Sequence, residues 1–444
     1  MAEKPWADMT ADEKLAWRID RWRNPGMEFK NREAEAEYKA RVDRLVAALS
    51  LEKPDRVPIV LSIGFWPAKH AGMTPYEAMT DPVRAGQAWI DFNLEFQPDA
   101  MSDLRGYTTP ISMFEKLDYK LFAWPGHGIP KETSYQYYEQ EWMGPDEYDA
   151  LIADPTGYLL RTYLPRTVGA FAGFSGLSSF LDLIGMPSVS THVGGWGSPD
   201  MLDGLERLTA AAREVDNWAR TVLPAIDQVN AMGFPAYRTG VSLAPFDILG
   251  DTLRGTKGVM LDMFRRPEKV IEACERLVPM AIDWALKRPT PLATPIVFVP
   301  LHKGADGFMS DEQFRTFYWP TLHKVLLGLI DEGVIPLLFA EGRYDSRLEV
   351  IMDLPKGKTV WRFDQTDMAR AKQTIGRVAC LEGNMPLSLL HAGTPGEVVA
   401  HTRKLIDAAG EGGGYIMDIG AVADDGKAEN LLAMINATKE YGVY

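Results

Sequence analysis

The sequence predicts an α/β fold, a (β/α)8 TIM barrel with an N-terminal helical arm and an aromatic-rich insertion. Short apolar runs alternate with helical segments over the last third of the 444-residue chain, which is typical of βα units and a parallel sheet. Each of these runs ends in a carboxylate followed by a polar or glycine-rich turn. In a barrel, the carboxyl ends of all strands share one rim, where active sites lie.

The count of apolar runs favours a closed barrel. Four runs follow one another between residues 333 and 420, and their end sequences are AEGR, DQ, EGN and DIG. Four more runs precede them, of which the second is the weakest. We expect the eight strands to begin at Val57, Asp99, Ala236, Ile296, Val334, Thr359, Val378 and Tyr415.

Two segments lie outside the regular βα pattern. Residues 1–50 predict a helical arm with helices over 11–22 and 31–49, and the barrel is expected over 51–444. An insertion at about 110–199 is too long for a simple βα loop and is rich in aromatic residues. It could form a lid over the barrel mouth, a dimer contact or an aromatic mini-core packed on the barrel wall. A long amphipathic helix is expected directly after it, over 199–232.

Composition excludes several classes of partner. The net charge of −14 argues against nucleic acid or an anionic membrane surface, since both require basic patches. No run of 18 apolar residues predicts a membrane span, and the charged N-terminus lacks the apolar core of a signal peptide. The two cysteines, Cys274 and Cys380, form no CxxC pair, so we expect a reduced cytoplasmic protein without a thiolate zinc site.

Strand-end residues are the candidates for catalysis. His302 directly follows an apolar strand and precedes a glycine-containing loop, so it could act as an acid, a base or a metal ligand. Glu341 is its expected partner, and Asp418 is the third candidate. Each has a structural alternative: His302 could merely bond a carboxylate, Glu341 could pair with Arg343, and Asp418 could tie down its loop.

These three side chains also form a reasonable ligand set for a divalent metal, although spacing alone does not decide this. His192 lies in a predicted glycine-rich loop that could face a ligand. No P-loop, GxSxG or HExxH motif occurs. The expected substrate-binding residues are Phe65, Trp66, Asp103, Arg105, His192, Trp196, Phe246, Arg343 and Asp364.

Six short motifs, in this order along the chain, resemble the uroporphyrinogen decarboxylase superfamily. The resemblance covers roughly residues 50–105 and 235–444 and implies a (β/α)8 barrel. That superfamily holds porphyrinogen decarboxylases and the methyltransferases of corrinoid-dependent methyl transfer. The motifs are PDRVPI (54–59), RRPEKV (265–270), MSDEQF (309–314), GNMP (383–386), GTPGEV (393–398) and ENLLAM (429–434).

The active-site patterns of both branches are altered. The decarboxylases carry an arginine-rich loop after the first strand, but residues 62–69 are SIGFWPAK, so a tetracarboxylate macrocycle is a poor substrate. The zinc methyltransferases carry His-x-Cys at a strand end and a later Gly-Cys. Here the first pair falls on Phe339 and Glu341, and the later cysteine on Ala421, so thiolate zinc is not expected.

The resemblance and the strand-end residues together predict a methyltransferase for a small, aromatic or methoxylated substrate. The methyl group would pass to a corrinoid (cobalamin), carried by a partner protein or bound at the barrel mouth, and a homodimer is a further expectation. His302 or Glu341 would protonate the leaving oxygen. One alternative is a decarboxylase or other lyase, with Arg105 or Arg343 holding a carboxylate and His302 donating the proton. The other is a non-catalytic ligand-binding barrel.

Overall fold

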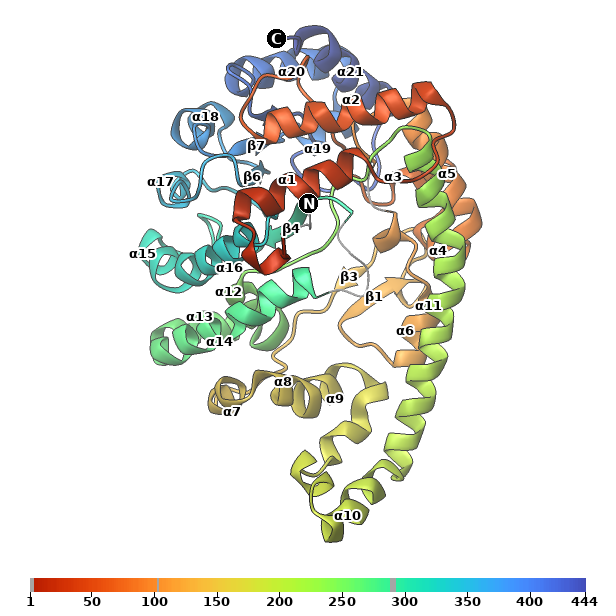
Figure 1. Ribbon diagram of the computed structural model, residues 1–444, viewed down its shortest axis with the longest axis vertical. Helices are drawn as coiled ribbons and strands as arrows, with labels where there is room; N and C mark the ends of the chain where they lie inside the picture. The colour runs from red at the N-terminus through yellow and green to blue at the C-terminus, as the bar shows by residue number, and fades with distance from the viewer. Residues whose placement is uncertain (1–3, 102–103, 288–292) are drawn as a thin grey trace.

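The computed structural model describes residues 4–101, 104–287 and 293–444. A parallel sheet of five strands lies inside the body and helices surround it (Figure 1). Residues of the strands are almost all buried, which is why they read as continuous apolar runs. In spatial order the strands are β4 (Ile296–Leu301), β5 (Ile335–Ala340), β6 (Val360–Phe363), β7 (Cys380–Glu382) and β8 (Tyr415–Ile416).

Helices connect each strand to its parallel neighbour, as a parallel sheet requires. The mixed α/β fold with a parallel sheet is therefore confirmed. The connecting and closing helices are α15 (Asp311–Gln313), η7 (Phe314–Tyr318), α16 (Trp319–Asp331), α17 (Leu348–Ile351), α18 (Met368–Ile375), α19 (Leu387–Ala392), α20 (Pro395–Ala409) and α21 (Ala428–Tyr441).

The other three predicted strands, near residues 57, 99 and 236, form single bridges instead of regular strands. The backbone N–H of Asp99 also donates to the carbonyl of Ile59 over 2.8 Å. These contacts lie between β8 and β4 in the order of the sheet, but a complete eight-stranded barrel stays a prediction. The parallel bridges join Ile59 with Met417, Met101 with Ala236 and Val241 with Phe298.

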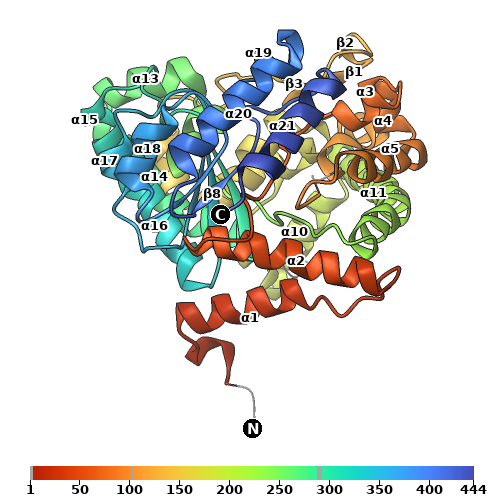
Figure 2. The ribbon, with the colours of Figure 1, turned by 90° about the horizontal axis from the view of Figure 1, so that it is seen from above.

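The N-terminal arm consists of η1 (Trp6–Asp8), α1 (Ala11–Arg23) and α2 (Arg32–Leu49). The side chains of Thr10 and Asn31 cap the two α-helices by accepting from backbone N–H groups of the first turn. Val42 and Leu45 of α2 are fully buried in one cluster with the first residues of several strands. The arm therefore packs on the amino ends of the strands and leaves their carboxyl ends free. Figure 2 shows α1 and α2 running together along one side of the body.

The segment between the arm and the sheet is mostly helical. It begins with α3 (Trp66–His70), α4 (Pro75–Thr80) and α5 (Pro82–Phe96). The insertion contains a small sheet of three strands, β1 (Phe122–Pro125), β2 (Gly128–Ile129) and β3 (Gln136–Tyr137). η2 (Arg105–Tyr107) directly precedes the insertion, whose helices are α6 (Ile111–Leu117), α7 (Tyr148–Ala153), α8 (Pro155–Tyr158), η3 (Leu159–Tyr163), α9 (Leu164–Thr167), η4 (Gly169–Gly176), η5 (Phe180–Leu183) and α10 (Met186–Trp196).

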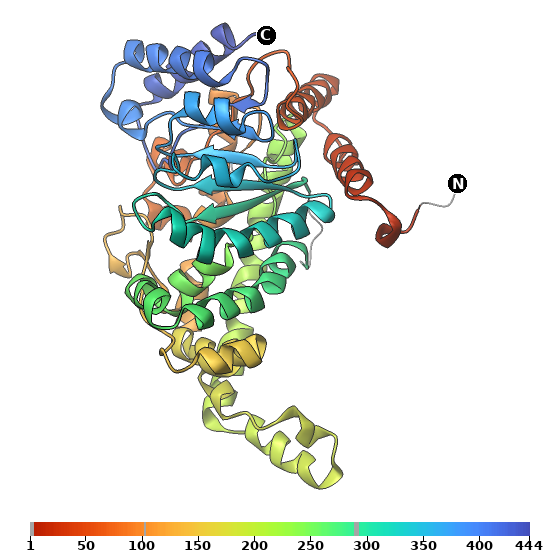
Figure 3. The ribbon, with the colours of Figure 1, turned by 90° about the vertical axis from the view of Figure 1, so that its left-hand side faces the viewer.

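A helix of 33 residues, α11 (Pro199–Ala231), follows the insertion and agrees with the amphipathic helix predicted over 199–232. It runs along one edge of the molecule, and α10 extends away from the body at its far end (Figures 1 and 3). Four helices then lead to β4: α12 (Pro245–Asp247), η6 (Ile248–Leu253), α13 (Gly255–Arg265) and α14 (Pro267–Leu286). Within the described ranges, no helix combines the length and apolar character needed to cross a membrane.

Candidate active site

His302 directly follows β4, and a buried carboxylate fixes its backbone. Asp247, the last residue of α12, is fully buried and accepts hydrogen bonds from the backbone N–H groups of His302 and Lys303, each 3.0 Å long. The hydroxyl of Tyr318 donates to the same carboxylate over 2.7 Å. These donors satisfy the buried charge and give His302 a defined position at the carboxyl end of the sheet.

The imidazole of His302 lies between two further carboxylates. Its Nδ1 is 2.5 Å from Asp251 Oδ2, and its Nε2 is 3.6 Å from Oε1 of Glu341, directly after β5. The side chains of His302 and Glu341 are 35% and 44% exposed, whereas that of Asp251 is 14% exposed. Glu341, the partner expected from the sequence, therefore lies beside His302 on the solvent side, and Asp251 lies on the inner side.

Asp247 and Asp251 were not among the residues that the sequence singled out. They are four residues apart in the helical segment formed by α12 and η6, so they lie on one face of it and both contact His302. η6 is a π-helical turn, a wide conformation that often occurs at functional sites. The useful signal was a pair of aspartates at helical spacing directly after an apolar run.

These carboxylates keep His302 charged at neutral pH. Burial lowers the pKa of His302, but the hydrogen bond that its Nδ1–H donates to Asp251 and the negative charges of Asp247, Asp251 and Glu341 outweigh this effect and raise the pKa to about 9. Burial, followed by the charge of Asp251, raises the pKa of Asp247 to about 7. Burial also raises the pKa of Glu341, against the opposing charges of His302 and Arg362. The arrangement can thus supply a proton at the open end of the sheet.

Two residues of the insertion, Tyr137 and Glu139, contact the residues around His302 at the carboxyl end of the sheet. The hydroxyl of Tyr137 donates to the backbone carbonyl of Asp251 over 2.6 Å. The carboxylate of Glu139 lies 3.0 Å from Nζ of Lys303 and accepts from the backbone N–H of Thr256 over 2.7 Å. Because Lys303 Nζ is also 2.9 Å from Asp251, the insertion and the imidazole share one network of charges.

The insertion also builds a small aromatic core. Phe114 and Trp124 stack with their ring centroids 5.0 Å apart, and Phe122 meets Tyr135 edge to face at 5.8 Å. These rings belong to one buried cluster that also contains residues of α3 to α5. The mini-core and the rim contact therefore coexist in the same segment, while a dimer contact stays a prediction.

Asp418 takes part in a buried ion pair with Arg362. Its carboxylate lies 3.2 Å from Nε of Arg362 and accepts hydrogen bonds from the backbone N–H and the hydroxyl of Ser62, at 2.7 and 2.5 Å. Arg362 and Asp418 are 1% and 0% exposed, so this is a buried ion pair. Arg362 and Ser62 thus contact the carboxylate of Asp418. That Asp418 acts in one set with His302 and Glu341 stays a prediction.

A second buried acid, Glu382 at the end of β7, adjoins this pair. The hydroxyl of Tyr237 donates to Glu382, and both residues are buried. Burial, followed by the charge of Asp418, raises the pKa of Glu382 well above its usual range. Burial and the neighbouring carboxylate of Asp418 thus both favour the neutral form of Glu382.

Two arginines each lie over one ring of a stacked pair, Phe298 on β4 and Phe339 on β5. The guanidinium of Arg238 lies 3.6 Å from the ring centroid of Phe298 on β4, and that of Arg362 lies 4.0 Å from the ring of Phe339 on β5. The two rings stack at 6.3 Å with an interplanar angle of 23°. Neither arginine was predicted to be functional, although a charged residue within the apolar run of β6 was a visible signal.

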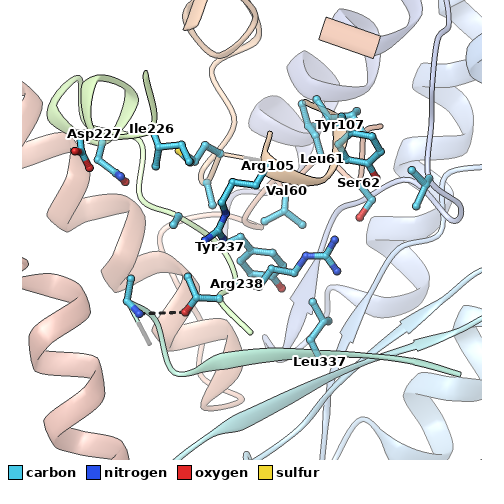
Figure 4. A pocket seen from close by; sticks show the side chains of 18 of the residues that line it. Val60, Leu61, Ser62, Arg105, Tyr107, Ile226, Asp227, Tyr237, Arg238 and Leu337 are labelled. Atoms are coloured by element: carbon cyan, nitrogen blue, oxygen red, sulfur yellow. Dashed lines mark hydrogen bonds between the residues drawn. The ribbon is translucent and has the colours of Figure 1, made fainter. Parts of the chain in front are cut away.

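A cavity of about 200 Å³ lies beside Arg238. Arg105, Tyr107, Tyr237, Ser62 and Leu337 are among the residues that line it, and side chains of α11 close one side (Figure 4). Of the arginines expected to bind substrate, Arg105 therefore lies at a cavity. Arg343 is 65% exposed and lies 3.6 Å from Asp345, which places it on the surface.

The aromatic residues expected to bind substrate are not gathered in one place. Phe65 is fully buried, with ring centroids 5.2 Å from Tyr107 and 6.0 Å from Tyr135. Trp66 and Phe246 are buried within the main core and do not line the cavity. The rings around Phe65 come instead from η2 and the insertion, whose fold the local sequence did not indicate.

His192 and Trp196 lie far from the sheet. The expectation of a glycine-rich loop at His192 is wrong, because both residues belong to the helix α10 at the outer end of the insertion (Figure 3). His192 is 2% exposed, and its Nδ1 lies 3.0 Å from the hydroxyl of Ser178. We therefore interpret His192 as a structural residue of the insertion.

Asp364 fixes a loop next to the site. Asp364, directly after β6, accepts a hydrogen bond from the backbone N–H of Gly342 over 3.0 Å, so it ties down the loop that follows Glu341. Asp103 lies outside the described residues.

The donor set for a metal is not assembled in the described part of the chain. No group of three or more His, Cys, Asp or Glu side chains in it could hold a metal ion. Cys274 and Cys380 are both fully buried, and burial raises the pKa of each thiol. These residues do not fit a thiolate zinc site.

Comparisons with known proteins agree with the fold. The model of the family described as uroporphyrinogen decarboxylase (URO-D) matches residues 197–441. A uroporphyrinogen decarboxylase of Pseudoalteromonas translucida (strain TAC 125) is 28% identical over 140 residues, which cover 30% of this chain and 39% of that protein. One of Cellvibrio japonicus (strain Ueda107) is 31% identical over 119 residues, which cover 26% and 32%. The matches thus span less than half the length of these relatives.

A solved structure, titled a methyltransferase from Methanosarcina mazei, has a similar fold. Its TM-score is 0.55 at 16% sequence identity, and the match covers 90% of this chain and 98% of that chain. At this identity the likeness concerns the fold alone.

Proposed function

The chain belongs to the uroporphyrinogen decarboxylase family as a divergent member, and on this premise we propose that it is a methyltransferase in a corrinoid-dependent system. Its substrate would be a small, aromatic or methoxylated compound. A decarboxylase acting on a tetracarboxylate macrocycle is less well supported, because the loop over residues 62–69 contains no arginine.

The observation that carries the proposal is the imidazole of His302 between Asp251 and Glu341. In methyl transfer from an ether, the bond between the methyl carbon and oxygen breaks, and oxygen keeps the electron pair. An unprotonated alkoxide or phenoxide is a poor leaving group, so a proton delivered to that oxygen lowers the barrier. His302, with its pKa raised to about 9, is protonated at neutral pH and can supply it from Nε2.

Asp251 and Glu341 have different roles in this scheme. Asp251 holds Nδ1 at 2.5 Å, which orients the ring and stabilises its charged form. Glu341 lies 3.6 Å from Nε2 and is 44% exposed, so it can return a proton from solvent to His302 after each turnover. Asp247 fixes the backbone of His302 and Lys303.

A reduced corrinoid, when bound, supplies a strong nucleophile that accepts the methyl group. His302 and Glu341 are partly exposed at the carboxyl end of the sheet, which is compatible with access by a corrinoid-carrying partner or by the free cofactor. The residues around His302 would bind and orient the substrate and hold the proton. We also propose that the bridges between β8 and β4 belong to a closed eight-stranded barrel with this rim as its mouth.

The test is demethylation of a panel of methoxylated aromatic compounds in the presence of cob(I)alamin, followed by chromatography of the demethylated product. We expect product from at least one compound, and a loss of turnover in His302→Gln. His391→Gln is a matched control, because His391 is also a partly exposed histidine beside a carboxylate: it is 40% exposed and lies 3.1 Å from Asp425. No product from any compound, or equal loss in both variants, contradicts the proposal.

A decarboxylase of a smaller acid is the second candidate, favoured by one observation. Arg105 lines the cavity of about 200 Å³ and could hold a substrate carboxylate there. His302, the proton donor expected from the sequence, does not line this cavity. Release of CO₂ from an acid, without any need for cob(I)alamin, would favour this candidate over methyl transfer.

A further inference from the structure

The outer end of the insertion carries a surface patch of apolar side chains. Five of the seven residues over 180–186 are large apolar residues, and each is 45–90% exposed. Val193 is 55% exposed and follows Met186 by seven residues on α10, so two helical turns place both on the same side of that helix. We call this surface the tip patch, and its residues are Phe180, Leu181, Leu183, Ile184, Met186 and Val193.

The segment that carries the tip patch is held in place by its own polar residues. The imidazole of His192 is buried, its Nδ1 lies 3.0 Å from the hydroxyl of Ser178, and its ring centroid lies 5.2 Å from that of Phe180. The hydroxyl of Ser188 donates to the carbonyl of Asp182 over 2.7 Å. These contacts fix the connection between η5 and α10, so the exposed apolar side chains belong to an ordered surface.

The area of the tip patch is that of one half of a protein–protein interface. A large apolar residue presents roughly 150–250 Å² when fully exposed, so the six residues together expose on the order of 700 Å². The largest apolar patch on a typical monomer covers about 300–600 Å². A stable interface buries about 800 Å² on each partner. The tip patch therefore exceeds the usual monomer surface and approaches what a stable dimer needs.

Charged residues are scarce around the tip patch. Over residues 177–199 the only Asp, Glu, Lys or Arg is Asp182, although 24% of the residues of the whole chain are charged. The centres of protein–protein interfaces are depleted of charge in the same way. No Lys or Arg occurs between Arg166 and Arg207, so the patch lacks the basic residues that accompany binding to anionic lipids. A protein partner is favoured over a membrane surface.

A second copy of the chain suits the tip patch. A two-fold axis brings the same surface of two copies together, so the surface must be complementary to itself. An apolar surface meets this condition, because its side chains bury one another and require no opposite charge on the partner. α10 extends away from the body (Figure 3), so two tips can meet while the bodies stay apart.

We propose that the tip patch is the two-fold interface of a homodimer of this chain. The dimer is independent of the proposed methyl transfer, since it requires no residue of the site around His302.

Light scattering during gel filtration of the full chain tests the proposal. One chain has a mass of 49.5 kDa, and the protein should elute with twice that mass. Leu181→Asp and Ile184→Asp each bring two like charges, one from each copy, into the interface, so each should raise the dissociation constant roughly tenfold or more. These side chains are 72% and 81% exposed in the single chain, so each variant should still fold.

Val83→Asp is the matched control. Val83 lies on α5, outside the tip patch, and is an aliphatic residue with 70% exposure. This variant should dimerise as the unaltered protein does. Thermal unfolding of each variant reports whether it is folded.

Chemical cross-linking tests the position of the contact. Cys274 and Cys380 are buried, so Met186→Cys introduces an accessible thiol on the tip patch. A bismaleimide should join two copies of this variant and should leave Val83→Cys as single chains. Equal cross-linking of the two variants, or none of Met186→Cys, would place the contact elsewhere and overturn the proposal.

Three further results would overturn it. The first is a mass of one chain at every protein concentration, and the second is a dimer on which Leu181→Asp, Ile184→Asp and Val83→Asp have equal effects. The third is a single chain that sediments with phosphatidylcholine vesicles and no longer does so in Leu181→Asp, which would assign the tip patch to a lipid surface. A dimer without any demethylation would support this interface and count against the proposed function, so the two can fail separately.

Discussion

Nδ1 of His302 lies 2.5 Å from the carboxylate of Asp251, although 51 residues separate the two along the chain. One residue follows a buried strand, and the other sits in a π-helical turn. The contact fixes which ring nitrogen faces inward and leaves Nε2 toward Glu341 and solvent. The predictions below follow from this contact and from the buried charges behind it.

Removing the imidazole should abolish most of the turnover. His302→Gln should lower kcat by roughly 10²–10⁴-fold, the usual contribution of general acid catalysis. Glu341→Gln should lower it less, because it removes a relay for the proton and leaves the donor in place. Measuring kcat of the two variants at saturating substrate checks both predictions. Equal rates for His302→Gln and the unaltered protein would show that His302 is not the donor.

Activity should depend on pH with a defined sign. The pKa of His302 is raised to about 9, so the donor is protonated below this value and activity should fall as the pH rises through about 9. In Asp251→Asn the main stabilising hydrogen bond to the charged ring is weakened, and the decline should begin at lower pH. A profile of kcat against pH for both proteins checks this. An unchanged profile in Asp251→Asn would contradict the role of that carboxylate.

The buried pair of Arg362 and Asp418 should matter for stability. Arg362→Gln leaves Asp418 buried without its counter-charge, which should lower the free energy of unfolding by about 3–5 kcal/mol. Arg343→Gln, on a side chain that is 65% exposed, should change it by less than about 1 kcal/mol. Denaturant unfolding of both variants provides the comparison. A small loss of unfolding free energy in Arg362→Gln, similar to that in Arg343→Gln, would mean that solvent reaches the buried pair.

The two thiols should be unreactive in the folded protein. Cys274 and Cys380 are fully buried, and burial raises the pKa of both. A thiol-reactive dye should label neither at neutral pH without denaturant and both after unfolding. Rapid labelling of the native protein would show an accessible thiol and reopen the question of a thiolate metal site.

The sequence predicted the parts of the fold that local patterns encode. The apolar runs gave β4 to β8 within about two residues, because strands buried on both faces must be apolar throughout. The position of His302 directly after one such run placed it at the carboxyl end of the sheet. The same argument placed Glu341, which follows the next apolar run, at the same end of the sheet.

The site residues that were missed depend on contacts between distant segments. Asp251 reaches His302 because a π-helical turn brings it there, and short sequence patterns do not reveal such turns. Asp418 pairs with Arg362, a buried residue of β6, and strand-end spacing did not reveal this partner. Phe65 finds its aromatic partners in Tyr107 and Tyr135, which depend on the fold of the insertion.

The most direct test of the account is the pKa of His302 itself, measured by NMR on protein with isotope-labelled histidine. His302→Gln assigns the signal among the seven histidines. The account predicts titration near pH 9 in the unaltered protein and a clearly lower value in Asp251→Asn. Titration of His302 near pH 6.5, unchanged by Asp251→Asn, would contradict it, since 6.5 is the pKa of an unperturbed imidazole.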